Sequence, residues 1–173
     1  LIRDYPLDDN SDILRNRATV LGGELIVNGN LEDGTNGWDA EASALAVVGG
    51  RLEVTSVGSP RPRAVQQITT ETGKQYLLEF DFEKGTAPNA QQVRISVNNL
   101  GDGEVFQQTY SASGKYFAYF TAAATSYYIS FGFGETASGQ TSYWDNVKIR
   151  QADGYGTVIN GNASDWGLFQ QQT

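Results

Sequence analysis

The chain has 173 residues with a net charge of -8, and it contains no Cys, His or Met. Without His or Cys, zinc sites, thiol chemistry and imidazole-based triads are excluded, and the acidic excess opposes binding to nucleic acid. The length suits one domain with extensions, while 20 Gly, 12% aromatic residues and the lack of a long helical stripe favour an all-β protein.

The two ends of the chain differ from its middle. Residues 1–23 are mostly polar, and the one stretch in them that could form a helix is too short and too polar to anchor a core. We therefore interpret these residues as an N-terminal connector. The lack of Met favours a processed or partial chain, and no apolar run reaches the roughly 18 residues of a membrane span. Residues 152–173 form either a C-terminal tail or the start of a following module, because 158–166 resembles 26–38 in its Asn-Gly-Asn and Trp residues.

Between these ends, short apolar stretches alternate with turns. In the clearest one, Tyr76, Leu78, Phe80 and Phe82 share one side and acidic residues share the other, which predicts a strand with one buried face. The pattern as a whole predicts an antiparallel β-sandwich of about nine to ten strands. The expected strands cover residues 24–27, 44–48, 51–57, 64–70, 75–83, 92–100 (with Val93, Ile95 and Val97 inward), 105–110, 116–121, 127–133 and 143–150.

The stretch from Val27 to Trp38 concentrates turn residues, two adjacent carboxylates and a Trp directly after the first expected strand. Asn and Gly let the backbone adopt positive φ, so several carbonyl oxygens can turn toward one point. With Glu32 and Asp33, the stretch is a candidate loop for a hard cation such as calcium.

This stretch, the strand that begins Gly73-Lys74-Gln75-Tyr76 and the closing Tyr143-Trp144-Asp145-Asn146-Val147 together resemble carbohydrate-binding modules of families 4, 9, 16 and 22. The resemblance covers residues 24–151 and implies a β-jelly roll. It also implies a structural calcium ion, with carboxylates from Glu32 and Asp145 and carbonyls near Asn30 and Arg51 as ligands. The residues alone leave another interpretation, in which Glu32 caps a turn and Asp145 accepts hydrogen bonds at a strand end.

The sequence departs from the family pattern at two places. Leu31 stands where these modules usually have Phe, which keeps an apolar anchor. Tyr116 and Phe117 follow Gly114 where a Trp is expected, which puts the sugar-facing surface in doubt.

A sugar site requires an exposed aromatic ring beside groups that form directional hydrogen bonds. The outward residues of the central strands offer this mixture, although such a polar row is also typical of a solvated sheet face. Trp38 and Trp144 are assigned to structure, Trp38 closing one end of the sandwich and Trp144 beside the ion. We expect Glu79, Asp81, Gln92, Arg94, Asn98 and Gln107 to line one polar face, with Tyr128 or Tyr119 as the aromatic platform.

Catalysis is not expected from this sequence. Glu79, Asp81 and Glu83 alternate along one strand at spacings of roughly 6–7 Å, within the range of glycosidase carboxylate pairs. We expect nothing apolar to flank them and raise the pKa of one of them.

Our first hypothesis is therefore a non-catalytic module of a larger extracellular or virion-surface protein, with neighbouring modules or subunits, that binds polysaccharide or surface glycan. The alternative is a structural or adhesive spacer, or a decoration, of a phage tail or head fibre without sugar binding.

Overall fold

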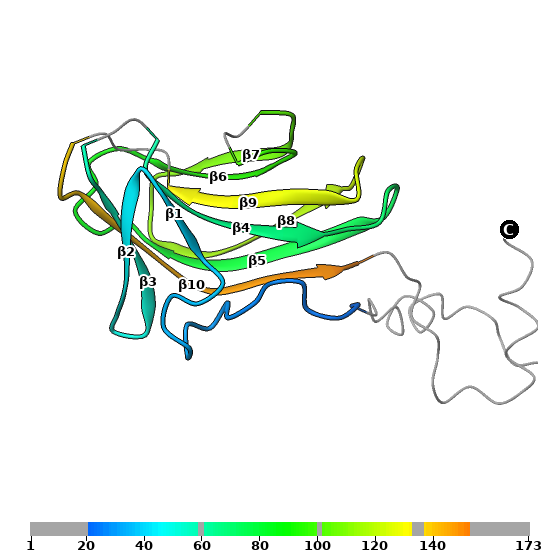
Figure 1. Ribbon diagram of the computed structural model, residues 1–173, viewed down its shortest axis with the longest axis horizontal. Coiled ribbons are helices and arrows are strands. Elements are labelled where there is room, and N and C mark those ends of the chain that lie inside the picture. The colour runs from blue at the N-terminus through cyan, green and yellow to red at the C-terminus, as the bar shows by residue number, and fades with distance from the viewer. Residues whose placement is uncertain (1–20, 59–60, 100–101, 133–136, 153–173) are drawn as a thin grey trace, which may run out of the picture.

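The computed structural model describes residues 21–58, 61–99, 102–132 and 137–152, which form a sandwich of strands (Figure 1). Most of the predicted connector 1–23 and the repeat-like stretch 158–166 lie outside these described residues. Within them, no helix is long and apolar enough to cross a membrane.

The described strands form two five-stranded sheets in which all paired neighbours are antiparallel. The first sheet has the order β1-β4-β9-β6-β7 and the second the order β2-β3-β10-β5-β8. This confirms the predicted all-β antiparallel sandwich with about nine to ten strands. The strands are β1 (Asp39–Glu41), β2 (Ser43–Val48), β3 (Arg51–Ser56), β4 (Arg63–Thr69), β5 (Gln75–Glu83), β6 (Gln91–Ser96), β7 (Glu104–Tyr110), β8 (Gly114–Thr121), β9 (Ser126–Gly132) and β10 (Thr141–Gln151).

An aromatic core joins the two sheets. Phe80 on β5 lies with its ring centroid 5.5 Å from Phe131 on β9 and 5.8 Å from Trp144 on β10. Trp38 adds an edge-on contact to Phe131 at 5.8 Å. Both Trp38 and Trp144 are buried, as expected for structural residues. Because close-packed interiors resist deformation, this core holds the outer faces of both sheets in fixed positions.

β10 contains a bulge between Asp145 and Lys148. Trp144 faces the core and so does Val147, three positions later, whereas an uninterrupted strand places such residues on opposite faces. The extra residue of the bulge reconciles them, and Asn146 there has a φ of 50°. The N–H of Val147 donates to the carbonyl of Gly29 at 2.9 Å, so the bulge joins the last strand to the turn 27–38.

Two side-chain amides hold the turn 27–38. Asn28 makes three hydrogen bonds within it, and the buried Gln66 of β4 makes three hydrogen bonds to it, so the turn is anchored to the first sheet as well as to β10. Asn28 Nδ2 donates to Gly34 O (2.9 Å) and Asn36 O (3.0 Å), Asn28 Oδ1 accepts from Asp33 N (3.0 Å), Gln66 Oε1 accepts from Val27 N (2.7 Å), and Gln66 Nε2 donates to Val27 O (2.9 Å) and Gly37 O (2.8 Å).

Two expected strand features differ from the structure. Residues 24–27 form only a bridge between Glu24 and Arg150, because the Glu24 carboxylate accepts three main-chain N–H groups and redirects the chain into the following turn. Val97 is 49% exposed instead of inward, because β6 ends at Ser96 and a loop begins there. The short strand β1 was not expected.

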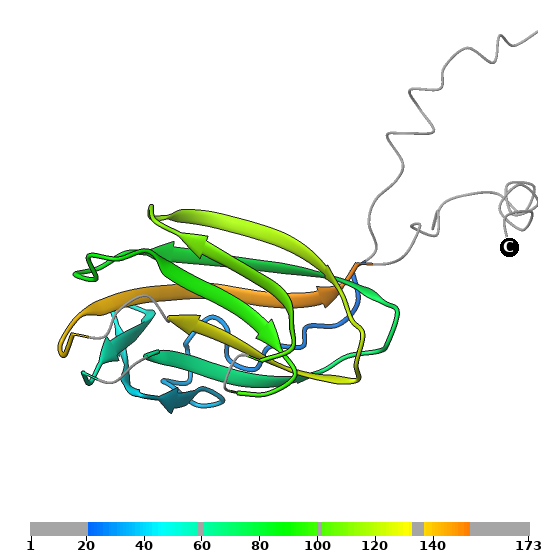
Figure 2. The same ribbon diagram turned by 90° about the horizontal axis from the view of Figure 1, so that it is seen from above.

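The two described ends of the chain meet at one end of the sandwich. The N–H of Gly22 donates to the carbonyl of Gln151 at 2.9 Å, and Figure 2 shows the start of the blue segment beside the tip of β10.

Candidate functional site

The sandwich divides the predicted ligand residues between two opposite outer faces. β5 and β6 follow each other in sequence but belong to different sheets. The expectation that outward residues of these strands line one polar face is therefore wrong. Of the residues in question, Gln92, Arg94, Gln107 and Tyr128 belong to the first sheet, Asn98 follows its strand β6, and Glu79, Asp81 and Tyr119 belong to the second sheet.

Each outer face is named here after its main aromatic residue. The Tyr128 face is the outward side of the first sheet, and the Phe117 face is the outward side of the second. The Tyr128 face consists of Arg63, Val65, Gln67, Gln92, Arg94, Gln107, Tyr128 and Ser130; the Phe117 face consists of Arg51, Leu77, Glu79, Asp81, Glu83, Lys115, Phe117, Tyr119, Tyr143, Asp145, Lys148 and Arg150.

The Tyr128 face presents a half-buried aromatic ring among polar side chains. Tyr128 lies on the central strand β9, opposite Gln67 on β4 and Ser96 on β6. Two positions along β9, Ser130 lies opposite Arg94. The Tyr128 ring therefore has the Gln67 amide directly across the ladder and the Arg94 guanidinium at a diagonal position. Amides and guanidinium groups are the groups that bind hydroxyl-rich ligands.

Neighbouring side chains fix the position of Arg94. Its Nε and Nη2 donate to the Gln92 side-chain oxygen at 3.2 and 2.9 Å, and its Nη1 pairs with Glu104 at 3.1 Å. Only 13% of the side chain is exposed. A guanidinium held in this way loses little conformational freedom when it binds a ligand.

Ser130 and Val65 form the floor of the Tyr128 face. Both are outward-facing partners in the β4–β9 ladder, yet Ser130 is 0% and Val65 2% exposed. Among the described residues, the Ser130 hydroxyl has no hydrogen-bond partner. A buried hydroxyl without a partner costs about 1–3 kcal/mol, so this part of the floor is locally destabilising.

Arg63 spans one end of the same face. Its side chain is buried, and its Nε donates to the carbonyl of Asn99, in the loop after β6, at 3.0 Å. Burial lowers the pKa of Arg63 from its ordinary value; Glu41 opposes this change, while Arg61 and Arg94 add to it. The guanidinium of Arg63 thus ties the loop after β6 to β4 and closes this end of the face.

Asn98 shapes a loop instead of joining the Tyr128 face. Its Nδ2 donates to the Asp102 carboxylate at 3.3 Å, and its Oδ1 accepts the Asp102 N–H at 3.1 Å. These two bonds use both ends of the amide to close the turn after β6.

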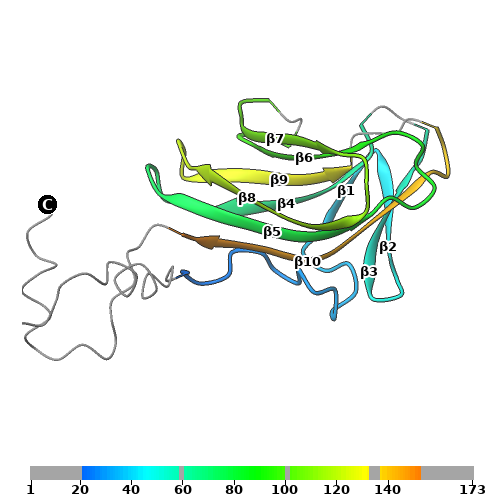
Figure 3. The ribbon, with the colours of Figure 1, turned by 180° about the vertical axis from the view of Figure 1, so that it is seen from behind.

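The Phe117 face carries the more exposed aromatic side chains. Phe117 is 70% and Tyr119 49% exposed, with ring centroids 6.4 Å apart and ring planes at 81°. Both lie on β8, the edge strand of the second sheet, which Figure 3 shows beside β5. Next to them, Lys115 donates to Asp81 at 2.9 Å, and this bond raises the pKa of Lys115.

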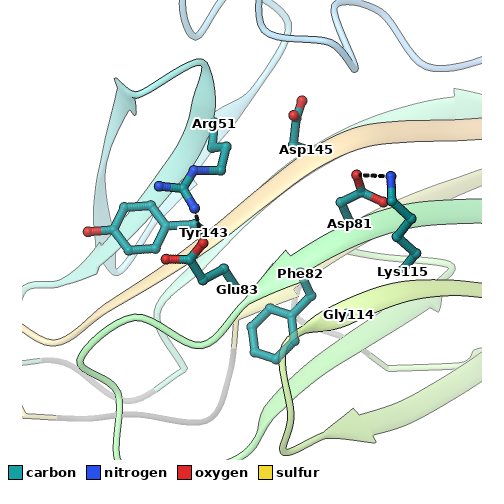
Figure 4. A pocket seen from close by; sticks show the side chains of 8 residues that line it. All are labelled: Arg51, Asp81, Phe82, Glu83, Gly114, Lys115, Tyr143 and Asp145. Atoms are coloured by element: carbon teal, nitrogen blue, oxygen red, sulfur yellow. Dashed lines mark hydrogen bonds and ion pairs between the residues drawn. The ribbon is translucent and has the colours of Figure 1, made fainter.

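A shallow pocket of about 260 Å³ lies farther along the Phe117 face (Figure 4). Arg51 pairs with Glu83 and places its guanidinium carbon 4.8 Å from the centroid of the Tyr143 ring. Figure 4 shows the Asp145 carboxylate pointing away from the Asp81–Lys115 pair. The pocket is lined by Arg51, Asp81, Phe82, Glu83, Gly114, Lys115, Tyr143 and Asp145.

Two of the predicted calcium ligands, Arg51 and Asp145, lie next to the bulge in β10, and the turn that contains Asn30 and Glu32 is joined to the bulge by one hydrogen bond. The ladder between β3 and β10 ends at Leu52 and Trp144, so Arg51 and Asp145 are the next residues on the two strands. Asn30 and Glu32 follow Gly29, whose carbonyl accepts the N–H of Val147 within the bulge.

Whether calcium fits here depends on how many oxygen ligands these residues can provide. The Asp145 carboxylate accepts hydrogen bonds from its neighbour Asn146 at 2.7 and 3.2 Å, and Glu32 is exposed. Within the described residues, no group of three or more acidic side chains could hold a metal ion. Calcium binds six to eight oxygens, so the two carboxylates fit this ion only together with main-chain carbonyls.

No family model matches the chain, and no curated protein matches it in sequence. Among solved structures, a CBM4 structure has a TM-score of 0.61 at 22% identity, covering 73% of this chain and 99% of that one. The chain has the fold of carbohydrate-binding modules.

Two further structures share the jelly-roll sandwich. The N-terminal cellulose-binding domain of Cellulomonas fimi β-1,4-glucanase C has a TM-score of 0.58 at 21% identity and covers 75% of this chain and 97% of its own. The CBM22-1 xylan-binding domain of Paenibacillus barcinonensis Xyn10C has a TM-score of 0.58 at 15% identity, covering 78% and 99%. At these identities the likeness establishes the fold.

Arg63 and Ser130 were missed as members of the site by sequence reasoning. Ser130 shares its side of β9 with Tyr128, which could have indicated an outward position. Its burial, and the reach of Arg63 toward the loop after β6, depend on contacts between strands far apart in sequence.

Proposed function

We propose that this domain is a non-catalytic carbohydrate-binding module that binds polysaccharide or surface glycan on its Tyr128 face, within a larger extracellular or virion-surface protein. The observation that carries the proposal is the grouping of the Tyr128 ring, the fixed Arg94 guanidinium and the buried Ser130 hydroxyl on one sheet face. The shared fold with carbohydrate-binding modules supports it.

The binding mode follows from the chemistry of a pyranose ring. Its apolar C–H face packs against the Tyr128 ring, since aromatic rings stack on such surfaces while their edges stay in water. Its hydroxyl oxygens accept hydrogen bonds from Arg94, and the Gln92 oxygen that orients Arg94 keeps the guanidinium in place. Ser130 lies beneath this face with its hydroxyl fully buried, so it shapes the floor on which the sugar rests.

The acidic row on the other sheet supports a non-catalytic role. Glu79 pairs with Arg150, Asp81 with Lys115, and Glu83 with Arg51. A glycosidase needs one carboxylic acid that stays protonated and a second carboxylate that stays free to act as nucleophile or base. Each of these three carboxylates is held by a basic partner, so none stands free as the second carboxylate of such a pair.

Affinity electrophoresis through gels that contain a panel of neutral and acidic polysaccharides tests the proposal. We expect retardation of the native protein by at least one polysaccharide and about tenfold weaker binding in Tyr128→Ala and in Arg94→Ala, equivalent to about 1.4 kcal/mol each. Tyr128→Phe, which keeps the ring, and Val57→Ala, at an exposed residue after β3 that belongs to neither face as defined above, serve as controls. No retardation by any polysaccharide would reject sugar binding and favour the fibre spacer or decoration.

We further propose that calcium stabilises the junction between the turn 27–38 and β10, with Glu32 and Asp145 as carboxylate ligands and main-chain carbonyls near Asn30 and Arg51. Its chemistry there would be electrostatic, since it would neutralise two acidic side chains at a junction that otherwise depends on hydrogen bonds. Support comes from the position of Asp145 at the bulge and of Arg51 beside it, and from the hydrogen bond that joins the bulge to the turn containing Asn30 and Glu32.

Thermal unfolding tests the ion. A ligand that binds only the folded state raises Tm by mass action, so calcium should raise Tm and a chelator should lower it. The double variant Glu32→Gln, Asp145→Asn should lose this difference, whereas Glu71→Gln, on an exposed residue away from the bulge, should keep it. An unchanged Tm, with no bound metal by elemental analysis of the native protein, would contradict the proposal.

A further inference from the structure

We propose that the Phe117 face is a second carbohydrate site, specific for neutral glycans, which makes the domain bivalent. The inference takes its ligand class from the proposed function of the Tyr128 face but depends on different residues. Because the two faces lie on opposite sides of the sandwich, two glycan chains can bind without competing.

The first argument is the exposure of two aromatic rings at a sheet edge. Phe117 and Tyr119 lie two positions apart on the same side of β8 and are 70% and 49% exposed. Their rings meet edge to face, so they present surfaces in different directions. Beside Tyr119, the outward-facing Leu77 of β5 is only 8% exposed and provides an apolar floor.

The second argument concerns charge. Three cations of this face, Arg51, Lys115 and Arg150, are paired with the acids of β5, while the exposed Lys148 of β10 lies opposite Glu79 without an ion pair among the described residues. A charged ligand would have to compete with these ion pairs, so its charge would contribute little to the free energy of binding. A neutral polyhydroxyl ligand can instead donate to the carboxylates and accept from the cations while leaving the pairs intact.

The third argument is the size of the surface. A stable protein partner requires about 800 Å² on each side of the interface, and the exposed aromatic side chains of β8 are two rings at the edge of the sheet. The adjoining pocket of about 260 Å³ lies just below the usual range of roughly 300–1,000 Å³ for drug-sized ligands. It suits a short part of a glycan chain.

These three features form a continuous path. On β8 the outward residues Lys115, Phe117 and Tyr119 lead from the pocket to the exposed rings, at a spacing of roughly 6–7 Å per step. An oligosaccharide that stacks on the rings can therefore extend to the Tyr143 and Arg51 side of the pocket, across Asp81.

The experiment uses the full chain carrying Tyr128→Ala, so that the first face is disabled, and follows backbone amide NMR shifts during titration with cellohexaose and xylohexaose. We expect saturable shifts of β8 and β5 amides. Adding Phe117→Ala and Tyr119→Ala should weaken this binding about tenfold or more. Adding Phe117→Tyr and Tyr119→Phe, which keeps both rings, should preserve it, and adding Val57→Ala should have no effect.

The outcomes separate this inference from the proposed function. Shifts confined to β9 and β6 in the native protein, with none on β8, would overturn the second site and leave the first. Shifts on β8 without any on β9 or β6 would support the second site and reject the proposed role of the Tyr128 face. Tighter binding of hexagalacturonate than of cellohexaose on β8 would overturn neutral specificity, and self-association that depends on Phe117 would show a protein contact instead.

Discussion

Gly29→Ala should break the junction between the turn 27–38 and the last strand. A Cβ added at Gly29 would lie 2.0 Å from the carbonyl oxygen of Val147 and 3.0 Å from Ile26 Cγ2. The first neighbour is main chain and cannot rotate away, so the turn and the bulge must separate. The hydrogen bond from Val147 N to Gly29 O, 2.9 Å long, is then lost.

The size of the effect follows from these two losses. Overpacking against a fixed main chain costs about 1–3 kcal/mol, and the hydrogen bond contributes about 1 kcal/mol. Together they predict a loss of about 2–4 kcal/mol in the free energy of unfolding. For a protein of this size each kcal/mol shifts Tm by about 2–4 °C, so Tm should fall by about 10 °C.

Gly23→Ala is the matched control for this measurement. A Cβ at Gly23 meets no atom within 4 Å among the described residues, so its Tm should stay within about 2 °C of the native value. Both variants should be compared by calorimetry in chelator, which removes any contribution from calcium. Equal Tm values for Gly29→Ala and Gly23→Ala would refute the argument that the turn packs tightly on β10.

Three further results are expected. Gln66→Leu should lower the free energy of unfolding by about 3 kcal/mol, because it leaves main-chain groups of the turn without their three hydrogen bonds, whereas Gln67→Leu on the exposed side of β4 should cost less than about 1 kcal/mol; equal denaturant midpoints would contradict this. Desolvation, and then Tyr116, raise the pKa of Tyr110. The folded state therefore retains this proton more strongly than the unfolded state, and its stabilising effect is complete below the ordinary tyrosine pKa and is lost as pH rises through the folded-state pKa. Tm should thus decline above about pH 10 and decline less in Tyr110→Phe, and parallel Tm profiles for the two proteins would reject this cause. Finally, Trp38→Ala should cost about 3–5 kcal/mol in urea unfolding, because it removes the buried ring that contacts Phe131, and a cost below about 1 kcal/mol would show that the ring does not close the core.

The sequence predicted the fold because strand alternation is a local property. The alternation of apolar and polar residues from Tyr76 to Phe82 by itself indicates which side of the strand is buried. This side is the same whichever strands lie beside it. The composition likewise excluded His- and Cys-based chemistry. The junction of the turn 27–38 with the last strand was also predicted, since its residues recur in order in known modules, and the contact of Gly29 with Val147 confirms that the two segments meet.

The sequence also contained a sign of the bulge that was not used. Trp144 and Val147 are both large and apolar but differ in parity, and both cannot face the core from one regular strand. The bulge resolves this conflict, and it places Asp145 on the outer surface beside Asp81. The calcium ion that was expected there remains a prediction.

Only the tertiary structure decided which residues share a face. A strand pattern states which side chains point outward but not to which sheet the strand belongs, because sheet membership depends on pairing between segments distant in sequence. Asp81 and Arg94 are 13 positions apart in consecutive strands, and the jelly-roll connection sends them to opposite sides of the sandwich. The predicted set of ligand-binding residues therefore contained residues from two surfaces. Whether these residues form one binding face or two is decided only by how the strands pair.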